Sequence, residues 1–401
     1  MSIDRKNYVK IIIVALIRFF GDALFYAFLA RYFTTLGFSS IQLGILLGAI
    51  PGMAVLGNVV LSRVATNLKI NRFIFIVWIL IEGTFISLSG FLTSFWWVLL
   101  FDCICCFCSN SFYNLFDTFM IYISDKVDKS YSSIRVFGTI SYIFSTFIGG
   151  ILISFIGYKY VFMVGGILMI LSSLVFIFIK FDKNDFDVSE QESKIGPVKV
   201  KEILKNKNYI LYIICLILIL GVHWSSDSVY NLYTSYLNIS DTTFGYFASI
   251  TMVVEAITLI IASRFRTFKA FKTMFILSGF CLALRLSIFA IPGLNNYVYL
   301  STQLLRGVTY GLLVSSNLYF LSSIVKRKFV NKCFFIAVAA SETFSALMNL
   351  SSTTIISATS YTFVFSLLAS LTAASIIFAL MINPMKKTDL QAQSSISSTR
   401  I

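Results

Sequence analysis

Seven acidic residues lie inside long apolar stretches of this chain, where an ionised side chain is costly. They are Asp22, Glu82, Asp102, Asp117, Asp227, Glu255 and Glu342. The same stretches hold Arg18, Arg285, Arg306 and the single histidine, His223. A charge at the centre of a membrane-spanning helix costs at least about 2.5 kcal/mol, so each acid needs a cation, a proton or water. Because the acids outnumber the arginines, some must bind a proton or face water, which is the chemistry of a proton-coupled carrier.

Two pairs of these ionisable residues stand one helical turn apart. Arg18 and Asp22 can pair within one helix, which is consistent with a structural role and with a functional one. His223 and Asp227 share one face with Asn231, again at a spacing of one turn. A polar face on an otherwise apolar helix favours a water-filled cavity over lipid. We therefore expect the second group to line a binding site.

No pattern in the sequence indicates a metal or cofactor site. The cysteines Cys103, Cys105, Cys106 and Cys108 are close in sequence, but on a helix these positions spread around the axis and cannot converge on one ion. The sequence also has no phosphate loop, glycine-rich nucleotide fingerprint or zinc-binding histidine pair. We expect no metal and no cofactor.

The composition identifies the elements that must position the buried charges. Of 401 residues, 58% are hydrophobic and only 12% are charged, which excludes a soluble enzyme, a disordered chain and a disulfide scaffold. The net charge of +14 would suggest a nucleic-acid partner for a soluble domain. Here the basic residues stand between apolar stretches, so we expect no nucleic-acid partner and predict an all-α polytopic membrane protein.

Twelve apolar stretches are long enough to span a hydrocarbon core of about 30 Å, which takes roughly 20 helical residues. Their approximate limits are 8–34, 41–62, 71–93, 95–123, 133–156, 159–180, 209–236, 243–263, 271–291, 296–323, 332–357 and 361–383. Lys and Arg gather at the N-terminus, in alternate loops and at the C-terminus, whereas the opposite side has only Arg31 and Lys159. Basic loops remain in the cytoplasm, so both termini are predicted to be cytoplasmic.

The twelve stretches divide into two sets of six around a polar segment, residues 181–208. We predict an N-terminal six-helix half at 1–180, a cytoplasmic linker at 181–208, a C-terminal half at 209–384 and a tail at 385–401. An internal repeat supports this division, because Ser62 and Arg63 align with Ser263 and Arg264 in the equivalent loop of the second half.

The segment Tyr131-Ser-Ser-Ile-Arg135-Val-Phe-Gly138-Thr139 resembles the signature that opens the fifth helix in the major facilitator superfamily. The resemblance is to the branch of lactose permease, phenylpropionate permease and nucleoside proton symporters. It implies that Asp117 and Arg135 hold substrate hydroxyls, because Asp117 precedes Arg135 at the spacing of the permease acid. A carboxylate and a guanidinium together supply acceptors and donors for such a solute, although a helix-end salt bridge would look the same.

The second half resembles the same branch at several positions. Glu255 and His223 match an acid and a histidine of the phenylpropionate-like carriers, and Arg285 matches an arginine of the ninth helix. At two positions the sequence departs from the lactose permeases, since Arg306 replaces a histidine and Thr309 replaces the proton-carrying glutamate. Proton coupling is therefore expected to run through Glu255 or Glu342, together with Arg285 and Arg306.

Two further positions follow from the resemblance. Arg63 and Arg264 correspond to the loops that gate these carriers, although Ser62 stands where the family has an aspartate before the arginine. Glu82 and Asp102 fall on spans that often lie at the periphery of twelve-helix carriers, which favours a structural role for both.

We expect the major facilitator fold, with twelve helices in two pseudo-symmetric six-helix bundles. The predicted solute site consists of Asp117, Arg135, Tyr142, His223, Asp227 and Asn231. The predicted function is secondary active transport of a sugar, nucleoside or aromatic acid across the cytoplasmic membrane by proton symport, as a monomer. A proton-antiport exporter remains an alternative. A polytopic enzyme or a sensor is a weaker one, because the predicted external loops are short and the acids lie at midspan.

Overall fold

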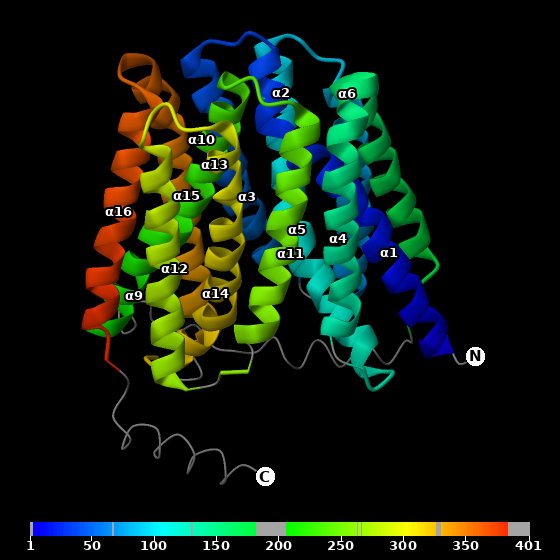
Figure 1. Cartoon of the computed structure of the whole chain (residues 1–401). Helices are drawn as coiled ribbons and strands as arrows, with labels where there is room; N and C mark the ends of the chain where they lie inside the picture. Colours follow the sequence, from blue (N-terminus) through cyan, green and yellow to red (C-terminus); the bar gives the residue numbers. More distant parts are fainter. Residues whose placement is uncertain are drawn as a thin grey trace. The chain divides into compact units, whose positions relative to one another are not determined.

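The computed structural model describes residues 3–65, 68–129, 131–181, 206–262, 264–265, 267–325 and 330–383, and all regular structure in these ranges is helical (Figure 1). The helices of the first part are α1 (Ile3–Tyr26), α2 (Leu29–Thr35), α3 (Ser40–Val64), α4 (Leu68–Ser89), α5 (Phe95–Asp125) and α6 (Ser132–Ile177). The later helices are α9 (Lys207–Leu216), η1 (Ile217–Gly221), α10 (Val222–Tyr236), α11 (Asp241–Ala262), α12 (Phe268–Phe289), α13 (Asn296–Ser301), α14 (Gln303–Ser322), α15 (Val330–Ala358) and α16 (Tyr361–Met381).

The described residues contain ten helices that are long and apolar enough to cross a membrane. The sequence predicts twelve spans, and the difference has two causes. The predicted spans 133–156 and 159–180 form one continuous element, α6, which is interrupted only where Gly157 adopts a positive φ of 78°. The predicted span 296–323 is divided into the short α13 and the more polar α14. Each predicted span thus coincides with a helix or part of one, and the all-α, multi-pass membrane architecture is confirmed.

The helices pack into two compact units. The first consists of Met1–Gly196, Ser228–Met252 and Ala346–Ser357, and the second of Pro197–Asp227, Val253–Ser345 and Ala358–Ile401. Three helices, α10, α11 and α15, therefore contribute residues to both. Most of the predicted linker 181–208 and the predicted tail 385–401 lie outside the described residues, so the division into an N-terminal and a C-terminal half stays a prediction.

Small residues allow α1 and α4 to pack closely against α6. A Cβ atom at Gly21 of α1 would lie 2.5 Å from the carbonyl oxygen of Gly165, and one at Gly166 would lie 2.3 Å from that of Gly83 on α4. Helices in a membrane gain little from the hydrophobic effect, so close van der Waals contact at glycines is a main source of their association. These contacts set the rotation of α1 and α4 against α6, and with it the direction of the charged side chains on both helices.

In the second unit, α12 packs against α14 and α16, and α9 packs against α16. Polar side chains cap the helix ends, since Thr267 and Ser360 accept hydrogen bonds from the first turns of α12 and α16. The predicted span 209–236 is not a regular α-helix, because a π-helical turn at Ile217–Gly221 separates α9 from α10. Such turns change the direction of the side chains that follow, and here the next turn contains His223.

Candidate functional site

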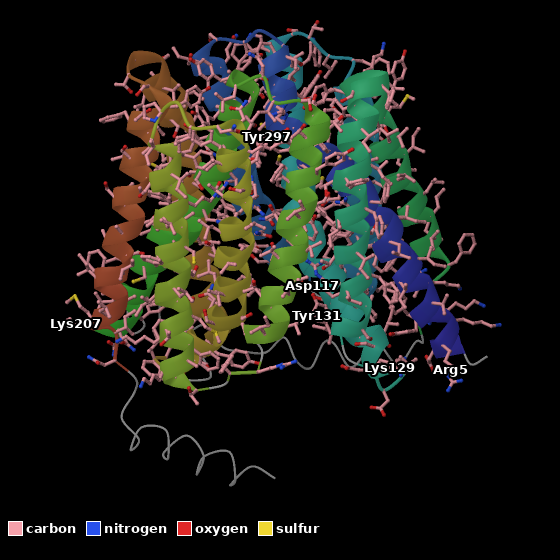
Figure 2. The ribbon with its side chains drawn as sticks, viewed as in Figure 1. Arg5, Asp117, Lys129, Tyr131, Lys207 and Tyr297 are labelled. Carbon is pink, nitrogen blue, oxygen red and sulfur yellow. The ribbon has the colours of Figure 1, made fainter. Side chains whose placement is uncertain are left out.

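The predicted pair of Asp117 and Arg135 comes together in the first unit. Nη1 of Arg135 lies 3.8 Å from Oδ1 of Asp117, and both side chains are partly exposed. The hydroxyl of Tyr131 donates a hydrogen bond of 2.8 Å to the same oxygen, and Figure 2 labels Asp117 and Tyr131 close together. The guanidinium thus stands beyond hydrogen-bond distance from the carboxylate, and Nη1 of Arg135 is a buried nitrogen without a hydrogen-bond partner among the described residues.

Tyr131 lies between α5 and α6, outside the apolar stretches. Burial raises the pKa of its hydroxyl above the ordinary value for tyrosine; the charge of Arg135 opposes this effect and that of Asp117 adds to it. The hydroxyl therefore stays protonated at physiological pH and remains a donor to Asp117. Tyr131 is part of the segment that carries the family resemblance, but the sequence alone assigned it no contact.

Aromatic rings position the guanidinium of Arg135. Its central carbon lies 4.7 Å from the ring centroid of Phe19 on α1 and 6.0 Å from that of Tyr113 on α5. A Cβ atom at Gly138 would lie 2.7 Å from the Phe19 ring, so glycine at this position lets α6 bring Arg135 close to α1. Tyr142, another predicted solute ligand, is half-buried on the same helix.

A cluster of three charges, Arg18, Asp22 and Glu82, lies at the centre of the first unit, and we call it the charged triad. Nη1 of Arg18 donates to Oδ1 of Asp22 at 2.6 Å, and Nη2 donates to both oxygens of Glu82 at 2.8 and 2.9 Å. The side chains of Arg18 and Glu82 have 0% exposure and that of Asp22 has 3%. The carboxylate of Glu82 is thus buried and joins α4 to α1, a partner that the sequence did not reveal.

Two tyrosines complete the charged triad. Tyr26 donates a hydrogen bond of 2.9 Å to Glu82, and Tyr113 donates a short one to the second oxygen of Asp22. The ring of Tyr113 also lies beneath Arg135, as described above. One tyrosine thus contacts both the charged triad and the candidate solute pair. Its position four residues before Asp117 places the two on one face of α5, which is a signal available in the sequence.

Asp102 on α5 is also buried, with 3% exposure. The thiol of Cys106 lies 3.5 Å from one of its oxygens, and the other oxygen has no hydrogen-bond partner among the described residues. The neighbouring cysteines are free thiols, and the described residues contain no group of side chains that could hold a metal ion.

The predicted charges of the second unit gather on Asp227. Its two oxygens accept hydrogen bonds from Nη1 of Arg285 at 3.0 Å and from Nε of Arg306 at 2.8 Å. Nε2 of His223 lies 3.7 Å from the same carboxylate, and the imidazole stacks on Tyr310 with ring centroids 5.3 Å apart. Asp227 is thus the anion that both arginines contact, a pairing that the sequence reasoning did not make.

The remaining predicted site residues are placed as follows. Glu255 is half-buried on α11, and Glu342 is buried on α15 with 7% exposure. Asn231 is half-buried on α10, in the part of that helix that belongs to the first unit. Arg63 lies in the last turn of α3 and Arg264 just beyond α11, and both are exposed. The proposed roles of these five residues stay predictions.

A further ion pair, Arg31 with Asp241, was missed from the sequence, where Arg31 is only one of two basic residues on the predicted external side. Arg31 is 5% exposed and donates to Oδ1 of Asp241 at 2.7 Å, to Oγ1 of Thr234 at 2.8 Å and to the carbonyl of Ile239 at 2.6 Å. Tyr158 donates a second hydrogen bond of 2.7 Å to Asp241. All of these residues belong to the first unit.

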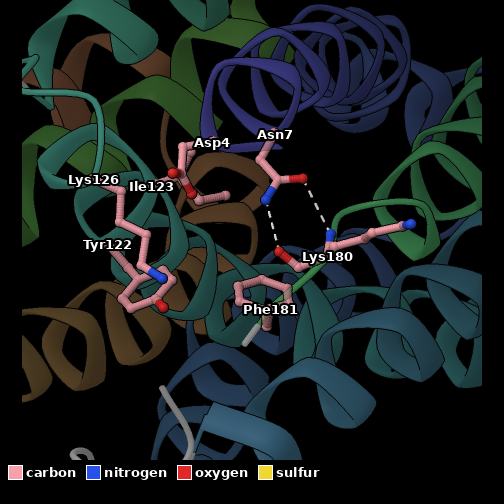
Figure 3. Close-up of a pocket in the computed structure, with 7 residues that line it drawn as sticks. All are labelled: Asp4, Asn7, Tyr122, Ile123, Lys126, Lys180 and Phe181. Atoms are coloured by element: carbon pink, nitrogen blue, oxygen red, sulfur yellow. Dashed lines mark hydrogen bonds between the residues drawn. The ribbon is translucent and has the colours of Figure 1, made fainter. Parts of the chain in front are cut away.

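A small surface hollow lies where α1 begins and the chain leaves α6 (Figure 3). The side-chain amide of Asn7 donates to the carbonyl of Lys180 at 2.7 Å, and its oxygen accepts from the Lys180 amide at 3.1 Å. None of the predicted solute or proton residues lines this hollow. Asn7 thus links α1, in the first predicted span, to Lys180 at the end of the sixth predicted span.

Comparisons with known proteins agree with this architecture. The sequence model of the MFS_1 like family matches residues 9–332. No curated protein gives a significant sequence match. A mutant of the nucleoside transporter NupG has a TM-score of 0.81 at 15% identity, covering 94% of this chain and 99% of that one. The unmutated NupG structure has a TM-score of 0.74 at 14% identity, covering 96% and 100%.

A third solved structure is a bacterial homologue of the human lysosomal transporter Spinster, in an inward-facing and unoccupied conformation. Its TM-score is 0.69 at 12% identity, covering 95% of this chain and 96% of that one. At these identities the likeness shows a shared fold over nearly the full length of each chain.

Proposed function

The chain belongs to the MFS_1 like family, and on this premise we propose that it imports a small polar solute together with protons. The protein is a multi-pass membrane protein and a secondary transporter. The solute class, the coupling ion and the direction are the proposal.

One observation carries the proposal for the solute. Asp117 and Arg135 stand 3.8 Å apart with partly exposed side chains, and Tyr131 and Phe19 fix their directions. A polyhydroxylated solute with an aromatic part fits such a pair, since hydroxyls bind the charged groups and a ring can pack on aromatic side chains. Two of the structural neighbours are titled nucleoside transporters, which makes a nucleoside the first solute to test among sugars, nucleosides and aromatic acids.

The buried charges support the proposal of proton coupling. Acids outnumber arginines in the apolar stretches, and a carboxyl group at membrane depth without a full countercharge is stable only with a proton or water. Glu255, Glu342, Arg285 and Arg306 remain candidates for this role in the second unit. We further propose that the protein acts as a monomer in the cytoplasmic membrane with both termini in the cytoplasm. Figure 2 is consistent with this topology, because Arg5 and Lys129 lie at the same end of the first unit.

The test is uptake of labelled uridine by proteoliposomes that contain the purified full-length chain. An inward proton gradient should increase the initial rate and drive accumulation, and a protonophore should abolish the accumulation. A sugar and an aromatic acid, added as unlabelled competitors, rank the three solute classes. Arg135→Ala should remove uptake, whereas Lys129→Ala at the same end of the unit should not. Uptake that ignores the proton gradient would contradict symport, and accumulation under an outward gradient would indicate antiport.

A further inference from the structure

We propose that Tyr113 positions Arg135 for the solute, with its ring against the guanidinium and its hydroxyl held by the charged triad. In this role the triad is the fixed support of a binding residue on another helix. The inference rests on the solute binding proposed above for Arg135. It assigns a function to Tyr113, which does not belong to the predicted solute site.

The position of the Arg135 guanidinium depends on aromatic contacts. Its central carbon lies 4.7 Å from the ring centroid of Phe19 and 6.0 Å from that of Tyr113, and the two centroids are 5.7 Å apart. The carboxylate of Asp117 lies 3.8 Å from Nη1, and this nitrogen has no hydrogen-bond partner among the described residues. A displacement of either ring would therefore change where the guanidinium points.

The hydroxyl of Tyr113 fixes the ring at its far end. It donates a hydrogen bond to Oδ2 of Asp22, whose other oxygen accepts one from Arg18 at 2.6 Å. The second side-chain torsion of a tyrosine is only weakly restricted by itself, so a hydrogen bond at the hydroxyl determines the tilt of the ring. The side chains of Asp22 and Arg18 have 3% and 0% exposure, so this anchor is enclosed by the helix bundle.

The charged triad can serve as the anchor because three helices meet at its guanidinium. Arg18 on α1 donates two further hydrogen bonds to Glu82 on α4, at 2.8 and 2.9 Å. Its central carbon lies 4.3 Å from the ring centroid of Phe112 on α5, the residue before Tyr113. Side chains keep a productive geometry when packing and hydrogen bonds lock the groups that support them. The triad thus gives Arg135, on α6, a support built from α1, α4 and α5.

Tyr26 is the natural comparison for Tyr113. Its hydroxyl donates a hydrogen bond of 2.9 Å to Glu82, so it is bound to the same triad. Its ring packs against Phe25, with centroids 4.9 Å apart, whereas the ring of Tyr113 lies against Arg135. Replacing either tyrosine by phenylalanine removes one hydroxyl from the triad. Only the change at Tyr113 should alter the guanidinium of Arg135.

The position of Arg135 can be tested without a solute by its reaction with phenylglyoxal, which modifies accessible guanidinium groups. Mass spectrometry of peptides from the full-length protein gives the rate at each arginine, with exposed Arg63 as the internal reference. Tyr113→Phe should raise the rate at Arg135 about threefold, and Tyr113→Leu, which also removes the ring, should raise it further. Tyr26→Phe should leave it unchanged. An unchanged rate in both Tyr113 variants, or an equal rise at buried Arg18, would overturn the inference.

Uridine uptake separates positioning from a general effect on the fold. Tyr113→Phe should raise the KM for uridine about fivefold at an unchanged maximal rate, and Tyr26→Phe should have a much smaller effect. In an Arg135→Lys background, which has no planar guanidinium to stack, Tyr113→Phe should not change the KM further. A further rise of the same size in that background would show that Tyr113 does not act through Arg135.

The two experiments distinguish failure of this inference from failure of the proposed function. If Tyr113→Phe changes the modification of Arg135 but Arg135→Ala still takes up uridine normally, the positioning role stands and uridine binding at Arg135 fails. If uptake requires Arg135 and neither readout responds to Tyr113→Phe, the proposed solute site stands and the positioning role fails.

Discussion

Nε of Arg31 donates a hydrogen bond of 2.7 Å to Oδ1 of Asp241, joining two residues that are 210 positions apart in the chain. The same guanidinium also binds the Thr234 hydroxyl and the Ile239 carbonyl. A nearly fully buried guanidinium with three kinds of oxygen partner forms a strong, directional contact. This contact holds the start of α11 against α2 within the first unit.

A cross-link beside this ion pair should stop transport if the contact opens during the cycle. Oγ of Ser154 on α6 lies 2.8 Å from Oγ1 of Thr242 on α11, so the two side chains point toward each other, as a pair of cysteines in a disulfide must. In a background without the native cysteines, we expect Ser154→Cys with Thr242→Cys to form a disulfide on oxidation. Uridine uptake should then cease and return on reduction. Ser154→Cys alone is the control, and full uptake by the cross-linked protein would show that this contact stays closed.

Tyr131→Phe should weaken solute binding without unfolding the protein. The variant removes the donor to Asp117, and a hydrogen bond to a charged group contributes ~1.5 kcal/mol or more, so the dissociation constant for uridine should rise about tenfold. Because burial raises the pKa of the Tyr131 hydroxyl, the wild-type donor persists as the pH increases. The difference between variant and wild type should therefore remain the same up to about pH 9.

Tyr8→Phe provides a matched control for this experiment. It removes a hydroxyl that is 2.8 Å from Oγ of Ser133, near the same end of α6 but away from Asp117. Binding of uridine to Tyr8→Phe should equal that of the wild type. Equal losses in both variants would indicate a general effect on the start of α6.

The charged triad has two carboxylates for one guanidinium, so the effects of removing each carboxylate on stability should not add. Asp22→Asn and Glu82→Gln each leave one carboxylate for Arg18, so both should unfold thermally near the wild-type temperature. The double variant leaves the Arg18 guanidinium without a countercharge in the triad. Breaking a buried ion pair in this way costs ~3–5 kcal/mol, so the double variant should be far less stable than the two single effects combined. Additive effects would show that the three charges do not act together.

Asp102→Leu should stabilise the protein. The carboxyl group is buried, has one weak thiol contact and leaves one oxygen without a hydrogen bond among the described residues. An unsatisfied buried polar group costs ~1–3 kcal/mol, which an apolar side chain avoids. Thermal unfolding monitored by circular dichroism measures the change, and Asp102→Asn distinguishes loss of charge from loss of polarity. Lower stability of the leucine variant would indicate a partner for Asp102.

Asp227→Asn should destabilise the second unit. It removes the carboxylate that both Arg285 and Arg306 contact, so two cations lose a common countercharge. We expect a loss of ~3 kcal/mol or more, and a smaller effect for His223→Gln, since His223 mainly stacks on Tyr310. A more stable Asp227→Asn variant would show that other groups balance these arginines.

Much of this architecture is predictable because membrane spans are encoded locally. Length and apolar composition fix where a helix can cross the bilayer, and the spacing of Arg18 and Asp22 makes their contact visible in the sequence. The partner of Arg18 on α4 was not predictable, since Glu82 is 64 residues away and its direction depends on how α4 rotates against α6. That rotation is set by contacts such as Gly83 with Gly166, which no local pattern reveals.

The contacts within the candidate site were also only partly predictable from the sequence. The family signature located Asp117 and Arg135, and the structure brings these two residues together. The sequence assigned Arg285 and Arg306 to Glu255, and that network stays a prediction; the contact that both arginines make with Asp227 was not foreseen. Asp227 follows the π-helical turn at Ile217–Gly221, and such a wide turn shifts a helical register that the sequence reading assumed to be regular.

The excess carboxylate in the charged triad also means that the protein should sense the membrane voltage. With both carboxylates ionised, the three buried side chains carry one net negative charge, and such a charge responds to an electric field across the bilayer. Displacing one elementary charge through the whole field changes its energy by about 2.3 kcal/mol per 100 mV. If the triad moves with its helices, a potential that is negative inside would favour the position in which this charge lies nearer the outer face.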